Sequence, residues 1–221
     1  FKDYLSNPVL SSTFSDVSVD TNVATTVTLK GTSAAINGTV YPSYYAFGGH
    51  LIVGSGGSLT ISDTYVNFLT DQGPTYILIQ NGGALVLNNV SISRTGPHGL
   101  YVYVIGTGSP SLKMTSGSMA STALAVRQAG SLDIVSTSFS GDLNAIGASS
   151  SVMINSGESY FGTVYARDGT MVLGGGNLSM PASDISNVQM TIEDAIIKNT
   201  LDLDRDSNII NSRFNGTLPA G

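Results

Sequence analysis

Residues 111–119 read SLKMTSGSM, residues 131–139 read SLDIVSTSF, and residues 151–160 read SVMINSGESY. Each stretch has an apolar residue, any residue and a second apolar residue after its first serine, then another apolar side chain several positions later. In the third stretch that later position is Tyr160, one residue late. The first apolar position recurs along the chain at Leu59, Leu85, Leu112, Leu132, Val152, Met171 and Met190, and a degenerate last copy contains Ile209 and Phe214. The spacings of 26, 27, 20, 20, 19 and 19 residues indicate one repeated structural unit.

Three short strands separated by turns are predicted in each unit. A further apolar run, such as Leu51–Val53 or 124–126, lies seven or eight residues before the first apolar position. Turns such as 54–57 and 81–83 separate the two runs, and their glycine and asparagine tolerate positive φ. No window sustains the i, i+3, i+4, i+7 spacing of an amphipathic helix. The chain is therefore predicted to be all-β.

Two β architectures compete for this pattern. An antiparallel sandwich has no reason to repeat every twenty residues, whereas a parallel β-helix stacks each coil on the last at about 4.8 Å and repeats its inward positions. We therefore expect a right-handed parallel β-helix (a solenoid) of about eight short three-stranded coils over residues 43–221. Strand alternation predicts two inward rows, formed by Leu59, Ile61, Leu85, Leu87, Leu112, Met114, Leu132, Ile134, Met171 and Leu173.

Over residues 48–214 this coil pattern resembles the right-handed parallel β-helix (pectate-lyase-like) superfamily, which includes pectate lyases, phage tailspikes and many surface proteins. The resemblance rests on the coils alone and is of the surface or structural type. It implies the fold and leaves the function open, because this scaffold carries enzymes, adhesins and structural proteins.

Residues 1–42 depart from the repeat and are predicted to form a strand-rich N-terminal cap or an assembly arm. Val17–Val19 and 23–29 are strand-forming runs. A cap would cover the open end of the coils, whereas an arm would add a strand to a neighbouring copy of the chain. For the arm, assembly contacts are expected at Phe1, Tyr4, Leu5, Val9 and Leu10.

Composition favours a secreted protein, extracellular or at the cell surface. Charged residues make up 11% of the chain, serine and threonine account for 52 of 221 residues, and cysteine is absent. The net charge of −6 makes nucleic acid and anionic membranes poor partners. No apolar run approaches the roughly 18 residues of a membrane-spanning helix, so membrane insertion is not expected. Because the chain begins at Phe1 and not Met, we expect either a removed leader or a chain that was trimmed at its start.

A calcium site is one interpretation of the acidic segment near the C-terminus. Asp202, Asp204 and Asp206 alternate with other residues, which places three carboxylates on one side of a strand. Carboxylate oxygens are ligands that calcium prefers, although Ser207 stands where a calcium-binding EF-hand loop needs glycine. The other interpretation is a solvated face. No other cofactor is expected.

Catalysis is not predicted. Lyases of the β-helix superfamily have clustered calcium-binding aspartates with an arginine or lysine on a neighbouring coil, and its hydrolases use paired aspartates with a histidine and Arg-x-Lys. Neither set is present, and the carboxylates of the middle coils are well separated in sequence, at Asp63, Asp133, Asp142 and Glu158. His50 and His98 are interpreted as loop residues.

Other sequence features leave several alternatives open. Weak N-glycosylation sequons occur at Asn37, Asn89, Asn177 and Asn215, about as many as chance supplies. Aromatic side chains gather at 41–47 and at Tyr101 and Tyr103, where they could stack on sugars, meet another subunit or pack the longer coils.

Three functions remain as hypotheses. The first is a structural subunit of a surface filament, fibre or layer, a homopolymer joined by β contacts between its own copies. The second is a carbohydrate-binding adhesin or tailspike-like module that recognises surface glycans. The third is a polysaccharide lyase.

Overall fold

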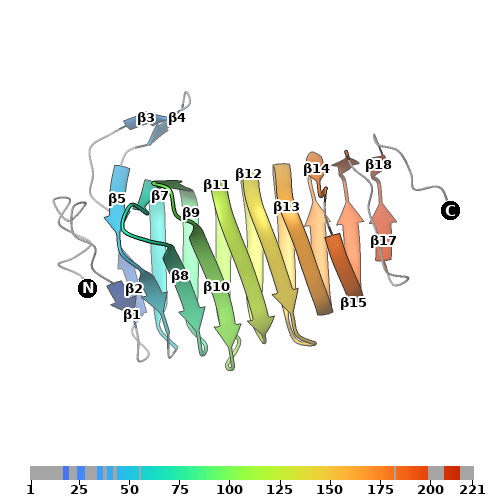
Figure 1. The fold of residues 1–221 in the computed structure, drawn as a ribbon, viewed down its shortest axis with the longest axis horizontal. Coiled ribbons are helices and arrows are strands. Elements are labelled where there is room, and N and C mark those ends of the chain that lie inside the picture. The colour runs from blue at the N-terminus through green and yellow to red at the C-terminus, as the bar shows by residue number, and fades with distance from the viewer. Residues whose placement is uncertain are drawn as a thin grey trace.

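The computed structural model describes residues 17–19, 24–27, 34–36, 39–41, 44–54, 56–181, 183–198 and 207–214. Within these ranges all regular secondary structure consists of β-strands (Figure 1). The described residues therefore contain no helix long and apolar enough to cross a membrane. The prediction of an all-β chain is confirmed.

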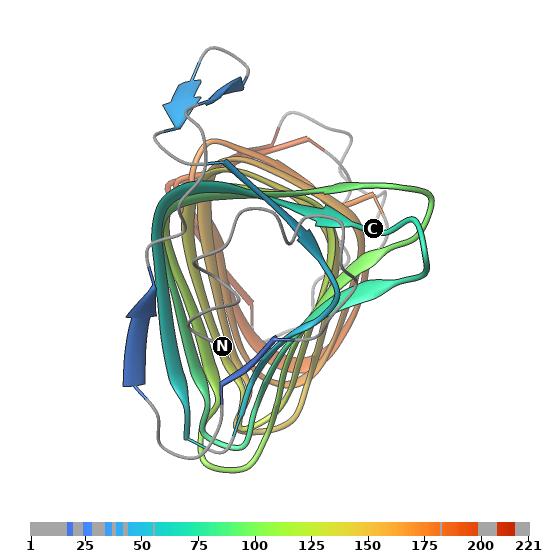
Figure 2. The same cartoon turned by 90° about the vertical axis from the view of Figure 1, so that its left-hand side faces the viewer.

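The strands pair in parallel on three sides of the molecule, which Figure 2 shows along the long axis. We call these three stacks the first, second and third ladders. The first ladder begins with β1 (Val17–Val19), β6 (Leu51–Val53), β8 (Thr75–Gln80) and β10 (Leu100–Gly106). The second begins with β2 (Ala24–Val27) and the first halves of β7 (Ser58–Leu69) and β9 (Ala84–Thr95). The third begins with β5 (Tyr44–Gly48) and the second halves of β7 and β9.

Three long strands bend around corners and contribute to all three ladders: β11 (Ser111–Gln128), β12 (Ser131–Ile146) and β13 (Ser151–Gly174). After them, β15 (Ser183–Glu193) continues the first and second ladders, and β17 (Ser207–Ile210) continues the second. The third ladder ends with β14 (Asn177–Ser179), β16 (Ile196–Ile197) and β18 (Arg213–Phe214). A separate antiparallel pair joins β3 (Ala34–Ile36) and β4 (Thr39–Tyr41).

The register of the second ladder follows the repeat in the sequence. Successive partners across its strands are the predicted first apolar positions Leu59, Leu85, Leu112, Leu132 and Val152. Apolar residues alternate with polar ones in these strands, so one face of each is buried between the ladders. All ten residues predicted to point inward are at most 5% exposed, which confirms this part of the core.

Tyr160, the later apolar position of its unit in the sequence pattern, does not belong to the core. It is 42% exposed, and the residues on either side of it, Ser159 and Phe161, are buried instead. In register, Ser159 lies opposite Phe139. The rings of Phe139 and Phe161 are 5.1 Å apart between centroids, so Phe161 fills this part of the interior.

Corners between the second and third ladders use residues that tolerate a left-handed backbone. Asp63 and Asn89 occupy this corner in successive turns with φ of 52° each, and Asn89 Nδ2 donates a hydrogen bond to Asp63 Oδ1 at 3.1 Å. In the next turn Gly117, at φ 89°, is the register partner of Val90. A Cβ on Gly117 would lie 2.0 Å from the Val90 carbonyl oxygen, so only glycine fits there.

The N-terminal strands continue two of the ladders. The strand prediction for Val17–Val19 is confirmed by β1, and that for 23–29 is confirmed over the described residues by β2; these strands pair in parallel with β6 and β7. The parallel stack therefore begins earlier in the chain than the repeat pattern indicated. Whether residues 1–42 also contact a neighbouring copy stays a prediction.

Candidate binding groove

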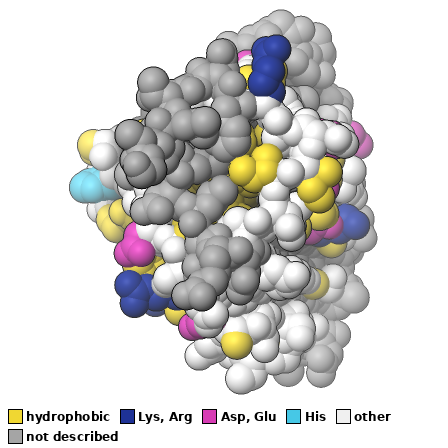
Figure 3. Space-filling model, turned by 90° about the vertical axis from the view of Figure 1, so that its right-hand side faces the viewer, with side chains coloured by type: hydrophobic (Ala, Val, Ile, Leu, Met, Phe, Trp, Pro, Cys, Tyr) yellow, Lys and Arg dark blue, Asp and Glu magenta, His cyan; other side chains and the backbone are white. Residues whose placement is uncertain are grey.

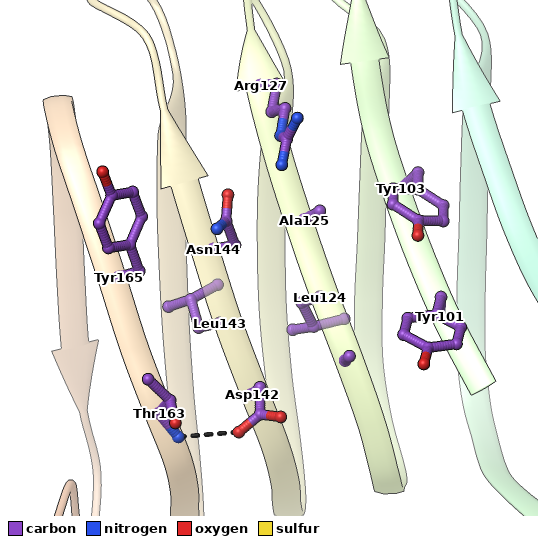
Figure 4. A pocket seen from close by; sticks show the side chains of 11 residues that line it. Tyr101, Tyr103, Leu124, Ala125, Arg127, Asp142, Leu143, Asn144, Thr163 and Tyr165 are labelled. Carbon is purple, nitrogen blue, oxygen red and sulfur yellow. Dashed lines mark hydrogen bonds between the residues drawn. The ribbon is translucent and has the colours of Figure 1, made fainter. Parts of the chain in front are cut away.

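A groove of about 310 Å³ lies on the outer face of the first ladder (Figure 4). Strands β10, β11, β12 and β13 supply its lining, mostly through side chains that alternate with buried ones and point outward, whereas the lining residues Leu124 and Leu143 belong to the buried core. The lining consists of Tyr101, Tyr103, Ala123, Leu124, Ala125, Arg127, Asp142, Leu143, Asn144, Thr163 and Tyr165.

Differences in side-chain length hollow out this face. In register, Tyr103, Ala125, Asn144 and Tyr165 lie side by side across four strands, and Tyr101 lies beside Ala123. The two alanines end at Cβ, whereas tyrosines stand on β10 and on β13 (Figure 4). The groove therefore has a low floor between two raised aromatic edges. We call Tyr101 and Tyr103 on β10 the first shoulder and Tyr165 on β13 the second shoulder.

In the first shoulder the Tyr101 and Tyr103 rings lie nearly parallel to each other. The Tyr101 and Tyr103 rings are 6.2 Å apart between centroids and inclined by 15°, and Tyr101 is 37% exposed. The Tyr101 ring lies against Gly99, where a Cβ would come within 2.8 Å of Cε2 and 2.9 Å of Oη. The absence of a side chain at Gly99 thus leaves the space that the Tyr101 ring occupies.

The loop before β10 is anchored by hydrogen bonds, and we call residues 96–99 the corner loop. The His98 carbonyl oxygen accepts hydrogen bonds from Arg94 Nη1 and Thr70 Oγ1, each at 2.9 Å. Arg94 Nη1 also donates to the carbonyl oxygen of Gly96 at 3.0 Å. These bonds fix the backbone that carries Gly99 and, through it, the position of the Tyr101 ring.

Polar groups on the groove floor can bind hydroxyl groups. Asp142 Oδ1 accepts a hydrogen bond from the Thr163 backbone N–H at 2.8 Å, which orients the carboxylate (Figure 4). Asn144 Oδ1 is buried and has no hydrogen-bond partner among the described residues. Arg127 adds an exposed guanidinium with several donors.

The second shoulder, Tyr165, is contacted by a neighbouring arginine. The Arg167 guanidinium carbon lies 5.1 Å from the centre of the Tyr165 ring, a cation–π contact. Arg167 Nη2 is in turn 3.7 Å from Asp184 Oδ2. Rings fixed before a ligand arrives lose less side-chain entropy when it binds.

Several residues predicted from sequence lie outside the described ranges. These are the calcium candidates Asp202, Asp204 and Asp206, the sequons at Asn37 and Asn215, and the assembly residues Phe1, Tyr4, Leu5, Val9 and Leu10. No group of three or more metal-ligating residues occurs within the part of the chain that the structure describes. Of the other sequons, Asn89 is exposed at a corner and Asn177 is half-buried in β14.

The groove joins a predicted aromatic pair to residues that the sequence did not single out. Tyr101 and Tyr103 were noted together because they are two positions apart. Tyr165 lies more than sixty residues away and reaches them only through the parallel register of four strands. The carboxylate of Asp142 lies on the groove floor, and His98 lies in the corner loop.

Comparisons with known proteins supply no further information on the site. No family model, curated protein or solved structure matches the chain.

Proposed function

We propose that the chain is a right-handed parallel β-helix and that its groove binds carbohydrate. The parallel register that returns every 19 to 27 residues supports the β-helix and its similarity to the pectate-lyase-like superfamily. The observation that carries the function is the groove itself, with tyrosines at both shoulders and hydrogen-bonding groups between them.

Sugars match this arrangement chemically. A pyranose ring has an apolar C–H face, which packs on an aromatic ring, and a rim of hydroxyl groups, which pair with amide, carboxylate and guanidinium groups. Tyrosine combines an apolar body with a polar tip, and binding sites of this kind join aromatic surface to a few placed polar groups. The proposed function is therefore that of an extracellular adhesin-like module for surface glycans.

Catalysis is not part of this proposal. Asp142 is the single carboxylate among the groove residues, and general acid–base cleavage of a glycosidic bond needs two positioned groups. The groove residues therefore do not support hydrolysis by a pair of carboxyl groups.

A glycan array followed by calorimetry tests the binding function. Tyr103→Ala and Tyr165→Ala should each lower affinity for the bound glycan roughly fivefold to tenfold, since each removes an aromatic contact. Tyr160→Ala is the matched control, because Tyr160 is a comparably exposed tyrosine outside the groove. Equal losses in all three variants, or no bound glycan on the array, would contradict the proposal.

A second candidate function is that of a subunit in a surface filament, fibre or layer. Among the described residues, β17 and β18 each pair on one side only, and Ile209 and Ile210 of β17 are 41% and 47% exposed. Figure 3 shows this end of the molecule, where hydrophobic side chains appear between polar ones. An open strand edge with apolar side chains favours pairing with another chain. Electron microscopy of the protein at high concentration would show polymers if this function holds and dispersed monomers if it does not.

A further inference from the structure

Three tyrosine rings lie close together on the outer face of the first ladder. The Tyr101 and Tyr103 rings of the first shoulder have centroids 6.2 Å apart and planes inclined by 15° (Figure 4). The Tyr76 ring of β8 meets the Tyr103 ring edge-on, with centroids 6.4 Å apart and planes inclined by 72°. Both separations lie within the range of interacting aromatic pairs, about 4.5–7 Å. We call these three residues the tyrosine cluster, in which Tyr103 contacts both of the others.

The fold sets the positions of these rings. Tyr101 and Tyr103 are two positions apart in β10, so their side chains leave the same face of the strand. The absence of a side chain at Gly99 leaves the space for the Tyr101 ring. Tyr76 is held by His50, which stacks on its ring with centroids 3.6 Å apart and accepts a hydrogen bond from its backbone N–H at 3.2 Å.

Other easily oxidised side chains are absent from the chain or are shielded. Cysteine and tryptophan do not occur in the sequence. Five of the six methionines are at most 1% exposed, and the sixth, Met153, is half-buried. Tyr101, in contrast, is 37% exposed. A one-electron oxidant at this face of the molecule therefore meets tyrosine first.

We propose that Tyr101 and Tyr103 are a site of oxidative coupling, at which a one-electron oxidant such as a peroxidase with hydrogen peroxide joins the two rings as dityrosine. Each phenol gives up one electron and one proton. The two radicals form a carbon–carbon bond between ring carbons next to the hydroxyl-bearing carbons. Each of these carbons then passes its hydrogen to its own phenol oxygen, and both rings become aromatic again. Hydrogen peroxide accepts the two electrons and two protons and becomes two molecules of water.

Geometry favours this pair over the contact with Tyr76. Two phenoxyl radicals join through the faces of their π systems, and rings inclined by 15° are closer to that arrangement than rings inclined by 72°. The Tyr76 ring is also stacked on His50. Holding two reacting groups together in this way converts a bimolecular step into an intramolecular one. The coupling does not depend on the proposed carbohydrate binding.

Peptide mapping after oxidation tests this proposal. The full chain, at a low concentration that disfavours encounters between molecules, is treated with peroxidase and hydrogen peroxide and then digested with trypsin. Trypsin cuts after Arg94 and Lys113, so both coupled tyrosines lie on peptide 95–113, whereas Tyr76 lies on peptide 31–94. Peptide 95–113 should be lighter by two hydrogen atoms, show dityrosine fluorescence and give no fragments from cleavage between residues 101 and 103. The chain should stay monomeric on a denaturing gel.

Variants test the pair and its placement. Tyr101→Phe and Tyr103→Phe should each abolish the loss of hydrogen from peptide 95–113, because phenylalanine has no phenol to oxidise. Gly99→Ala keeps both tyrosines but displaces a ring, so it should lower the yield of coupling severalfold. Tyr160→Phe is the matched control, since Tyr160 is a comparably exposed tyrosine outside the cluster, and it should leave the yield unchanged.

Four results would overturn the proposal. Peptide 95–113 could keep its mass, or it could be joined to peptide 31–94, which would make Tyr76 the partner. Covalent dimers without the change in peptide 95–113 would place the coupling between molecules. An unchanged yield in a folded Gly99→Ala variant would show that the placement of the rings does not matter. If Gly99→Ala does not fold, the fragment pattern of the unaltered protein and its loss in Tyr103→Phe decide the matter.

Discussion

Replacing Leu132 with alanine should lower the free energy of unfolding by about 3–4 kcal/mol. Leu132 is 1% exposed and lies in register between Leu112 and Val152, in the middle of the second ladder. Removing three buried carbons costs about 2.4 kcal/mol at about 0.8 kcal/mol per carbon. The cavity between packed neighbours adds roughly 1 kcal/mol more. Aspartate at the same position should prevent folding, because its charge would be buried without a partner.

Asp133 is the matched control because it is the next residue and points out of the stack. Its Oδ2 lies 3.8 Å from Lys113 Nζ, and the two side chains are 30% and 59% exposed. An ion pair in such a position contributes no more than about 1 kcal/mol, and ordinary surface replacements stay within about 0.5 kcal/mol. Asp133→Ser should therefore change the free energy of unfolding by no more than about 1 kcal/mol.

Urea unfolding measures both variants against the unaltered protein. Circular dichroism follows the strands and tyrosine fluorescence follows the side chains, and coincident transitions with equal m-values justify comparing the free energies. Equal losses for Leu132→Ala and Asp133→Ser would refute the inward and outward assignment of these neighbours. The packing of the second ladder as described would then be wrong.

Four further changes test other parts of the molecule. Gly117→Ala should lower stability by at least about 1–3 kcal/mol, because its Cβ would meet the Val90 carbonyl oxygen; a neutral result in urea unfolding would contradict the corner geometry. Gly99→Ala should displace the neighbouring ring and weaken glycan binding severalfold in calorimetry, with a melting temperature within a few degrees of normal; unchanged affinity would show that the ring's position is unimportant. EDTA should leave the melting temperature unchanged if residues 202–206 are a solvated face, whereas a loss of several degrees that calcium restores would establish a metal site. Deleting residues 1–10 should leave a folded monomer that forms no polymers in the electron microscope; polymers from the shortened chain would rule out the assembly arm.

The core could be predicted from the sequence because the repeat is short and regular where the turns are short. Spacings of 19 or 20 residues from Leu112 onward align the inward rows without reference to the structure. Tyr160 is the later apolar position of its unit in the sequence pattern, yet it lies outside the core. The structure places small Ser159 opposite bulky Phe139, and Phe161 supplies the remaining volume.

The sequence pattern did not show that β1 and β2 belong to the stack of parallel strands. Thr25 is the register partner of Leu59, thirty-four residues later, because the β3–β4 hairpin is inserted between β2 and β5. Neither the apolar residue nor the spacing of the repeat is present there, so the pattern began only at the next turn. Hydrogen bonding between parallel strands tolerates both departures, since it involves the backbone.

The groove was only half predictable. Tyr101 and Tyr103 face the same way because they are two positions apart in a strand, which sequence alone indicates. The position of Tyr165 depends on the length of every corner between β10 and β13, and β-bulges shift the register within β11–β12 and β12–β13. Those lengths cannot be read from a local sequence pattern, so Tyr165 could be placed beside the groove only from the structure.

The length of the corner loop can vary without disturbing the buried rows. Eight positions separate Ile92 from Leu100, whereas three separate their register partners Met119 and Thr122. Because each turn of a stacked protein touches only its neighbours, five additional residues at a corner leave the inward rows intact. Evolution can therefore lengthen, shorten or rewrite this corner one turn at a time and reshape the surface beside the tyrosines. The interior rows stay the same while the surface beside the tyrosines changes.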